Sequence, residues 1–328
     1  MAVEIGTASS AADLYAKLIS FLTTNADLVS AGQEWAVAWD TPAAYENQSD
    51  IVLRGPGLSG QDQVYVGMRL FQDPIGDTFF IQTVGMTGVL PTGLHYRDHV
   101  NVSPNFVRMF LDVGTMSYWF VANGRRFMVV VKISTNFEAM YAGLFLPYAT
   151  PLSYPYPFFL GGSAGATDSD GPFSWRSENS NHSHFPWPHN ANYYYTSGAV
   201  DGNAMLIDPS GSWKRLANSG GTAGTPCCIG PEYTDGEYFS SNDGSYDPRF
   251  IMTRTMDAYG GDRMLVPCTL IQKDPTDQTY GILDGAFRCQ GVANSAENLI
   301  TVDGVDHLVV QNVYRSDFND YWAMALEE

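Results

Sequence analysis

The segment from Tyr118 to Gly162 constrains the fold of this chain more than any other. It contains two apolar stretches, YWFVA and RRFMVVVKIS, on either side of Asn123-Gly124. Asn-Gly between strand-like runs is the strongest short-range signal for a β-hairpin, because both residues tolerate the positive φ of a type I′ turn. The aromatic, proline-punctuated stretch YAGLFLPYATPLSYPYPFFLGG then completes the segment. This segment predicts antiparallel strands, and it contains no nucleophile–base pair, phosphate loop or metal-ligand spacing.

Alternating apolar and polar residues predict strands over most of the remaining chain. In residues 34–40, Trp35, Val37 and Trp39 share one face. Short connections favour antiparallel pairing, and Asp303-Gly304 is a second hairpin signal. We therefore expect strands at 34–40, 64–71, 79–84, 106–113, 118–122, 125–134, 137–146, 264–271, 280–288, 299–302, 306–313 and 321–326.

One convincing helix is predicted, over residues 10–24. Its apolar stripe has the spacing i, i+4, i+7 and i+8 and consists of Leu14, Leu18, Phe21 and Leu22. Ser10 and Asp13 resemble a capping box at its start, and Asn25 can close its end. The stripe indicates that this helix packs on the protein's own sheet.

The composition and periodicity of the sequence change after Pro147. Residues 161–262 are rich in Gly, Ser, Asn, Asp and aromatic residues and show little periodicity, which is typical of long functional or surface loops. We expect a mainly β protein, a β-rich α+β fold with antiparallel sheets or a sandwich. Its parts would be a helix and β region at 1–160, a loop-rich aromatic insertion at 161–262 and a β region at 263–328 that packs back on the first. The three can also form one continuous domain.

Composition excludes some classes of function. The formal net charge of −18 over 328 residues repels phosphate backbones and anionic membrane surfaces, so we expect no nucleic-acid partner. No secretory signal and no transmembrane segment is visible, so we expect no membrane insertion. The four cysteines, Cys227, Cys228, Cys268 and Cys289, show no metal spacing and are expected to be free thiols.

Catalytic and metal sites find little support in the sequence. His182, His184 and His189 form the only histidine cluster; they could bind zinc, but no Cys or carboxylate stands at ligand spacing, and a polar loop is the plainer interpretation. No G-x-S-x-G elbow and no phosphate loop occurs. A carboxylate pair for polysaccharide hydrolysis remains open, because sequence does not show which acidic residues meet. We therefore expect no enzyme, no cofactor and no metal.

Aromatic residues around the loop-rich region are the candidate binding residues. Aromatic faces with polar neighbours suit protein interfaces, and they can also stack on sugars. Plain core packing is a further alternative. The candidates for an interface are Tyr154, Tyr156, Phe158, Phe159, Trp175, Trp187, Tyr193 and Tyr194.

Several blocks of this sequence resemble a family of virion structural proteins from tailed bacteriophages. The most specific is YWFVANGRRFMVVVKISTNFEAMYAGLFLPYATPLSYPYPFFLGGS. The others are AADLYAKLISFL, IVLRGPG, QVYVGMRLF, YGILDGAFRCQG, ENLITVDGVDHLVVQNVYR and NDYWAMALE. The resemblance fades over residues 163–262 and carries no catalytic residues.

This resemblance implies a component of the tail or baseplate that self-associates and docks with neighbouring tail proteins. It would be made in the host cytoplasm and located in the virion. Head decoration is a less favoured position. The alternatives are a module that binds bacterial surface glycans through its aromatic loops, with Trp175 and Trp187 as contacts, and a tail-borne polysaccharide hydrolase.

Overall fold

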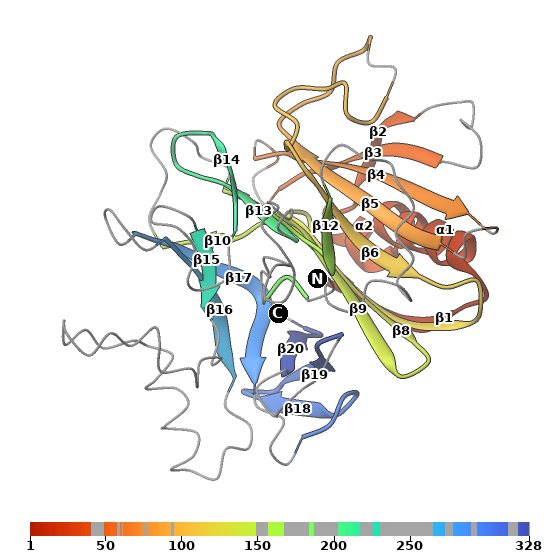
Figure 1. Ribbon diagram of the computed structural model, residues 1–328. Helices are drawn as coiled ribbons and strands as arrows, with labels where there is room; N and C mark the ends of the chain where they lie inside the picture. Colours follow the sequence, from red (N-terminus) through yellow and green to blue (C-terminus); the bar gives the residue numbers. More distant parts are fainter. Residues whose placement is uncertain are drawn as a thin grey trace, which may run out of the picture.

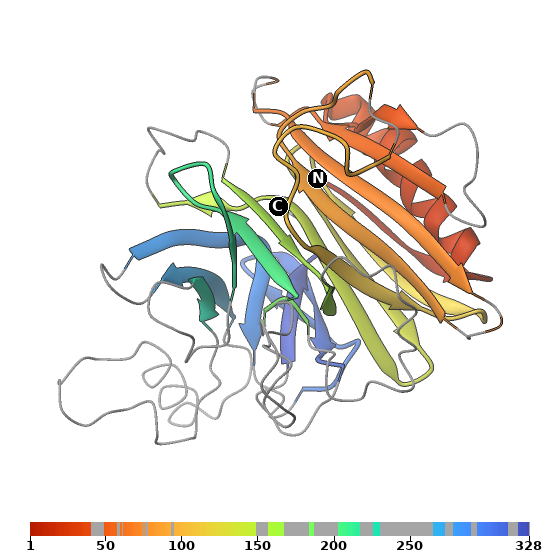
Figure 2. The same cartoon turned by 45° about the horizontal axis from the view of Figure 1, so that its top comes forward.

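The chain folds into three stacked antiparallel sheets. The computed structural model describes residues 1–40, 49–57, 60, 62–73, 75, 78–92, 95–148, 157–166, 184–186, 203–216, 226–229, 265–272, 278–289, 294–313 and 321–327. The mainly β fold with antiparallel sheets and an N-terminal helix is confirmed. Figures 1 and 2 show the N-terminal sheet in orange on one side of the yellow-green strands β8 and β9, and the blue C-terminal sheet on the other.

The inner strands of the central sheet are buried on both faces. Its strands, in spatial order, are β1 (Ala2–Ala8), β7 (Met116–Ala122), β8 (Arg126–Ile133), β9 (Asn136–Leu144), β11 (Phe158–Gly161), β13 (Ala204–Ile207) and β14 (Trp213–Arg215). Along β8, Val129 and Val131 pack toward the N-terminal sheet, while Met128 and Val130 pack toward the C-terminal sheet. A strand covered on both sides needs apolar residues at every position, which explains the uninterrupted run MVVV.

The N-terminal sheet covers the first face of the central sheet. Its spatial order is β12 (Ala164–Ala166), β6 (Phe106–Leu111), β5 (Thr78–Met86), β4 (Val64–Asp73), β3 (Ser49–Gly55) and β2 (Ala36–Asp40). Helix α1 (Ala11–Thr24) packs against strands of both sheets. We call this contact layer, which includes Phe120, Val129, Met140 and Phe158 of the central sheet, the N-terminal seam.

The C-terminal sheet covers the second face. Its spatial order is β15 (Pro226–Ile229), β16 (Val266–Gln272), β17 (Gln278–Cys289), β20 (Tyr321–Ala325), β19 (Val305–Gln311) and β18 (Leu299–Val302), and β10 (Leu146–Pro147) also pairs with β17. We call its contact with the central sheet, which includes Val130, Tyr141, Phe159 and Trp322, the C-terminal seam.

Both predicted hairpins form, but by different turns. Asp303 and Gly304 have φ of 52° and 84°, as the mirror-image turn requires. Asn123 and Gly124 do not have positive φ, so the expected type I′ turn is wrong at that position. Instead, the Asn123 side-chain oxygen accepts hydrogen bonds from the amides of Arg125 (3.0 Å) and Arg126 (3.1 Å). The Asn123 side chain thus stabilises a turn in which neither of these residues needs a positive φ.

The helix forms as its pattern predicts. Leu14, Leu18, Phe21 and Leu22 are buried. The Ser10 hydroxyl caps the amide of Asp13 at 3.2 Å, while the Asp13 carboxylate accepts from the amide of Ser9 at 2.8 Å. Asn25 ends α1, and its side chain also caps a short helix that was not predicted, α2 (Ala26–Ala31). Neither described helix has the length and hydropathy needed to cross a membrane.

Two local expectations differ from the structure. Strand β1 was not predicted, because its sequence AVEIGTA mixes apolar and polar residues without strict alternation. Trp35, which precedes β2, is buried, but Val37 within β2 is 49% exposed. The pairing of β2 with β3 shifts register between Val37 and Trp39, and this bulge breaks the alternation that would put Val37 and Trp39 on one face.

The described strands of residues 161–262 are shared among all three sheets. Strand β12 extends the N-terminal sheet, β13 and β14 extend the central sheet, and β15 extends the C-terminal sheet. This part of the chain therefore contributes to each layer.

Candidate functional site

The predicted interface residues divide into two groups. Phe158 and Phe159 are buried, with 3% and 0% exposure, and lie on opposite faces of β11. Their assignment to an interface is wrong, because β11 is an interior strand of the central sheet. The remaining candidates lie outside the described residues; they are Tyr154, Tyr156, Trp175, Trp187, Tyr193 and Tyr194.

Of the histidine cluster, only His184 is described. Its ring is fully buried, its Nε2 is 2.8 Å from the carbonyl oxygen of Phe137, and its Nδ1 accepts from Trp322 Nε1 at 2.9 Å. These contacts require the neutral tautomer that carries its proton on Nε2. Burial lowers the pKa of His184 to about 4. His184 therefore lies in a buried segment outside the helices and strands, and both of its ring nitrogens are engaged by β9 and β20 across the C-terminal seam.

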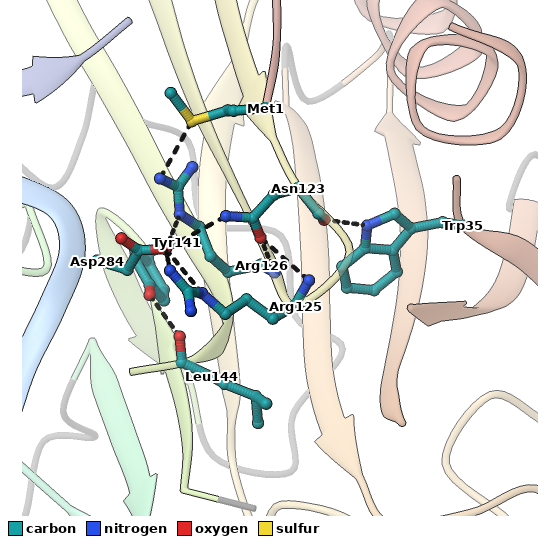
Figure 3. A network of polar contacts seen from close by, with 8 residues as sticks. All are labelled: Met1, Trp35, Asn123, Arg125, Arg126, Tyr141, Leu144 and Asp284. Atoms are coloured by element: carbon teal, nitrogen blue, oxygen red, sulfur yellow. Dashed lines mark hydrogen bonds and ion pairs between the residues drawn. The ribbon is translucent and has the colours of Figure 1, made fainter. Parts of the chain in front are cut away.

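A compact polar cluster lies where the β7–β8 turn meets β17 (Figure 3). The Asp284 Oδ2 atom accepts from Arg125 Nε at 3.0 Å, from Arg126 Nε at 3.0 Å and from Asn123 Nδ2 at 3.3 Å. The main-chain oxygen of Asn123 accepts from Trp35 Nε1 at 2.9 Å. We call Asn123, Arg125, Arg126 and Asp284 the Asp284 cluster; it connects the central sheet, the C-terminal sheet and the segment after α2.

An irregularity in β17 brings Asp284 to the cluster. Pairing with β16 passes from Ile282–Thr269 to Phe287–Pro267, leaving Asp284 and Gly285 in the extra length of β17. Gly285 has a φ of +74°, and a Cβ there would lie 2.7 Å from Arg126 Nη2. Glycine adopts this φ without strain, and a side chain here would have to displace the end of the Arg126 side chain. In the sequence this Asp-Gly pair looks like a turn, but the fold uses it to direct a carboxylate at two arginines.

The charges of the Asp284 cluster hold one another in the ionised state. Burial raises the pKa of Asp284, but the guanidinium groups of Arg126 and Arg125 outweigh that effect, so its pKa lies below the usual value. A carboxylate in this state is a hydrogen-bond acceptor and a poor proton donor. The cluster is therefore suited to holding two layers together.

A second polar group crosses the outer face of the N-terminal sheet. Asp50, Arg69, Gln82 and Arg108 stand directly opposite one another on β3, β4, β5 and β6. Arg69 binds Asp50 through two hydrogen bonds of 2.6 and 2.9 Å, and Arg108 Nε donates to Gln82 Oε1 at 3.1 Å. All four side chains are buried. Sequence analysis missed this row because its members come from four strands and share no local spacing.

Tyr96 and His95 contact the side chains of this row. Tyr96 accepts from Gln82 Nε2 at 2.8 Å, and the guanidinium of Arg69 lies 4.8 Å from the centre of its ring. His95 contacts both Arg69 and Asp50, and burial together with Arg69 lowers the pKa of His95. The paired charges and the neutral amide give this face a fixed pattern of contacts between strands.

The described thiols and acidic residues show no metal or nucleophilic arrangement. Within the described ranges, no group of three or more His, Cys, Asp or Glu residues could hold a metal ion. Cys268 and Cys289 are free and buried, and burial raises the pKa of Cys289 to about 12, where a thiol is a poor nucleophile at neutral pH.

Each sheet also exposes an aliphatic side chain on one edge strand. Ile5 of β1 is 58% exposed, Val37 of β2 is 49% exposed and Leu299 of β18 is 57% exposed. These strands are the ends of the central, N-terminal and C-terminal sheets, respectively. An edge strand presents unpaired main-chain groups to a possible neighbour.

No protein-family model matches the sequence, and no curated protein matches it.

Proposed function

We propose that this chain is a structural component of a tailed-bacteriophage virion, in the tail or baseplate. It acts by self-association and by docking with neighbouring tail proteins. The resemblance in the segment from Tyr118 to Gly162 suggests the family. The observation that carries an assembly role is the exposed aliphatic residue on an edge strand of each sheet: Ile5, Val37 and Leu299.

Three layers of rigid sheet suit a protein that must keep its shape while neighbours bind its edges. The buried charges described above are paired across strands and layers, where they hold the scaffold together. An exposed edge with an aliphatic side chain offers both main-chain hydrogen bonds and apolar area to a second strand. Proteins that assemble through such edges need no catalytic group. This proposal locates the protein in the virion.

Size-exclusion chromatography with light scattering tests the proposal. We expect the wild-type protein to form oligomers or to bind purified neighbouring tail proteins. A triple variant with Ile5→Lys, Val37→Lys and Leu299→Lys should lose these associations while it keeps its circular dichroism spectrum, because lysine on an edge opposes strand pairing.

A matched control separates edge pairing from general surface hydrophobicity. Val29→Lys, Leu90→Lys and Val113→Lys change three aliphatic residues that are 50%, 42% and 59% exposed and lie outside the three edge strands. This control should assemble like the wild type. A wild-type protein that stays monomeric and ignores every tail protein would refute the proposal.

A further inference from the structure

The chain passes from the central sheet to the N-terminal sheet at Gly162 and Ser163, between β11 and β12. The Ser163 amide donates to the carbonyl of Arg108 in β6 at 2.8 Å, and the Gly162 amide donates to the carbonyl of Asn203 at 2.8 Å. A Cβ at Gly162 would lie 2.6 Å from the Arg108 carbonyl oxygen. The crossing therefore fixes how closely the two sheets approach at this end of the N-terminal seam.

Glu138 of β9 lies beside the crossing. Period-two alternation puts it on the strand face shared by Met140 and Ala142, which pack in the N-terminal seam, and Glu138 is 2% exposed. Its carboxyl interacts with the hydroxyl of Ser163 and with the main-chain amide of Phe110 in β6. One carboxyl thus contacts both the crossing segment and the facing sheet.

Charged side chains on the surrounding elements are engaged elsewhere. Arg108 of β6 lies on the outer face of its sheet and donates to Gln82. Lys132 of β8 forms an ion pair with Glu297. Burial raises the pKa of Glu138 to about 8, although its contacts with Ser163 and Phe110 partly oppose the rise.

We infer that Glu138 is a proton-dependent switch in the N-terminal seam: with its proton it keeps the central and N-terminal sheets closed, and without its proton it loosens them. An ionised carboxylate in this apolar layer would need water, and water can reach it only if the sheets separate near Ser163. The neutral acid has no such requirement. The loosening is local, because the carboxyl faces away from the C-terminal sheet.

The C-terminal seam should respond in the opposite direction. The ionisable side chains that form hydrogen bonds across this seam are His184, which must stay neutral, and Asp284, which must stay ionised. Arg288 lies opposite Trp322, and its guanidinium donates to the carbonyl of Pro186. Acid protonates both His184 and Asp284 and alkali leaves both unchanged, so this seam should stay closed at the pH that opens the other.

Two measurements on the full chain test the inference. Urea unfolding of the wild type and of Glu138→Gln, between pH 5 and pH 9, gives the ratio of their unfolding equilibrium constants. This ratio should rise about tenfold per pH unit up to pH 8, because only the wild type loses a buried proton. Hydrogen-exchange protection at pH 9 relative to pH 7, corrected for intrinsic rates, should fall in β6 and β9 and stay unchanged in β20.

Glu327→Gln is the matched control, because it makes the same substitution at an exposed position and should leave the wild-type pH dependence unchanged. A ratio that does not vary with pH would overturn the inference. Equal loss of protection in β6 and β20 would also overturn it. The exchange experiment needs only the wild-type protein, so it decides the matter even where Glu138→Gln does not fold.

Discussion

The two seams of the central sheet bury similar apolar strands but use opposite chemistry for their polar ties. The C-terminal seam holds an ionised carboxylate between two arginines and a neutral histidine between a carbonyl and an indole. The N-terminal seam holds the buried carboxyl of Glu138 in contact with the hydroxyl of Ser163, and burial raises the pKa of this carboxyl to about 8. The difference teaches that one apolar sheet can face two environments, because the groups that surround a buried acid decide whether it is ionised or neutral.

Substitution of the adjacent phenylalanines of β11 should have the largest effect on stability and tests this comparison. Phe158 packs in the N-terminal seam and Phe159 in the C-terminal seam. Each change to alanine should lower the free energy of unfolding by about 3–5 kcal/mol, because it leaves a cavity in a filled core. Chemical denaturation measures the loss, and hydrogen exchange should show loosening mainly in β6 for Phe158→Ala and mainly in β20 for Phe159→Ala. Unchanged stability with lost assembly would instead restore the interface assignment of these residues.

Removing the carboxylate of the Asp284 cluster should have the next largest effect. Asp284→Ala leaves the guanidinium of Arg126 buried without its counter-charge, and the expected loss is about 3 kcal/mol, at the low end for a broken buried pair because Arg125 retains some solvent contact. Urea unfolding at pH 7 measures it. Asp284→Asn keeps the shape and should lose less. A cost near zero for Asp284→Ala would mean that the cluster is not a tie between layers.

Protonation of His184 should have a smaller effect on stability, and this effect is confined to acidic pH. The folded-state pKa of His184, about 4, lies below the unfolded value of roughly 6.5. The unfolded chain therefore binds the proton first, and the stabilising contribution is complete above pH 6.5 and is lost as pH falls toward 4. The loss at pH 5 should be about 2 kcal/mol.

The variant His184→Gln removes this acid-dependent loss, and comparing its urea unfolding with that of the wild type at pH 5 and pH 7 isolates it. In the wild type, the opposite proton linkages of His184 and Glu138 should offset each other between about pH 4.5 and pH 6.5. The stability contributed by this pair should then fall only above pH 6.5. A His184→Gln protein that is as acid-sensitive as the wild type would contradict this account.

The aromatic residues illustrate what could not be predicted from the sequence. Phe158 and Phe159 belong to a segment rich in tyrosine and proline, which is equally compatible with core and with interface. Their burial depends on β13 and the two outer sheets, which come from distant parts of the chain. Glu138 did leave a local signal, because it shares a strand face with Met140 and Ala142, and a carboxylate there breaks the apolar pattern. Asp284 left none, because its partners lie about 160 residues earlier.

The sequence by itself determined the elements that short-range physics controls. Leu14, Leu18, Phe21 and Leu22 specify the face of α1, and Asp303-Gly304 specifies a turn, because spacing and backbone preference act over a few residues. Only the tertiary structure decided which faces of the strands are covered and which ionisable groups meet. Burial and charge pairing depend on neighbours in space, and in this protein those neighbours are brought together by stacking three sheets whose strands come from both halves of the chain.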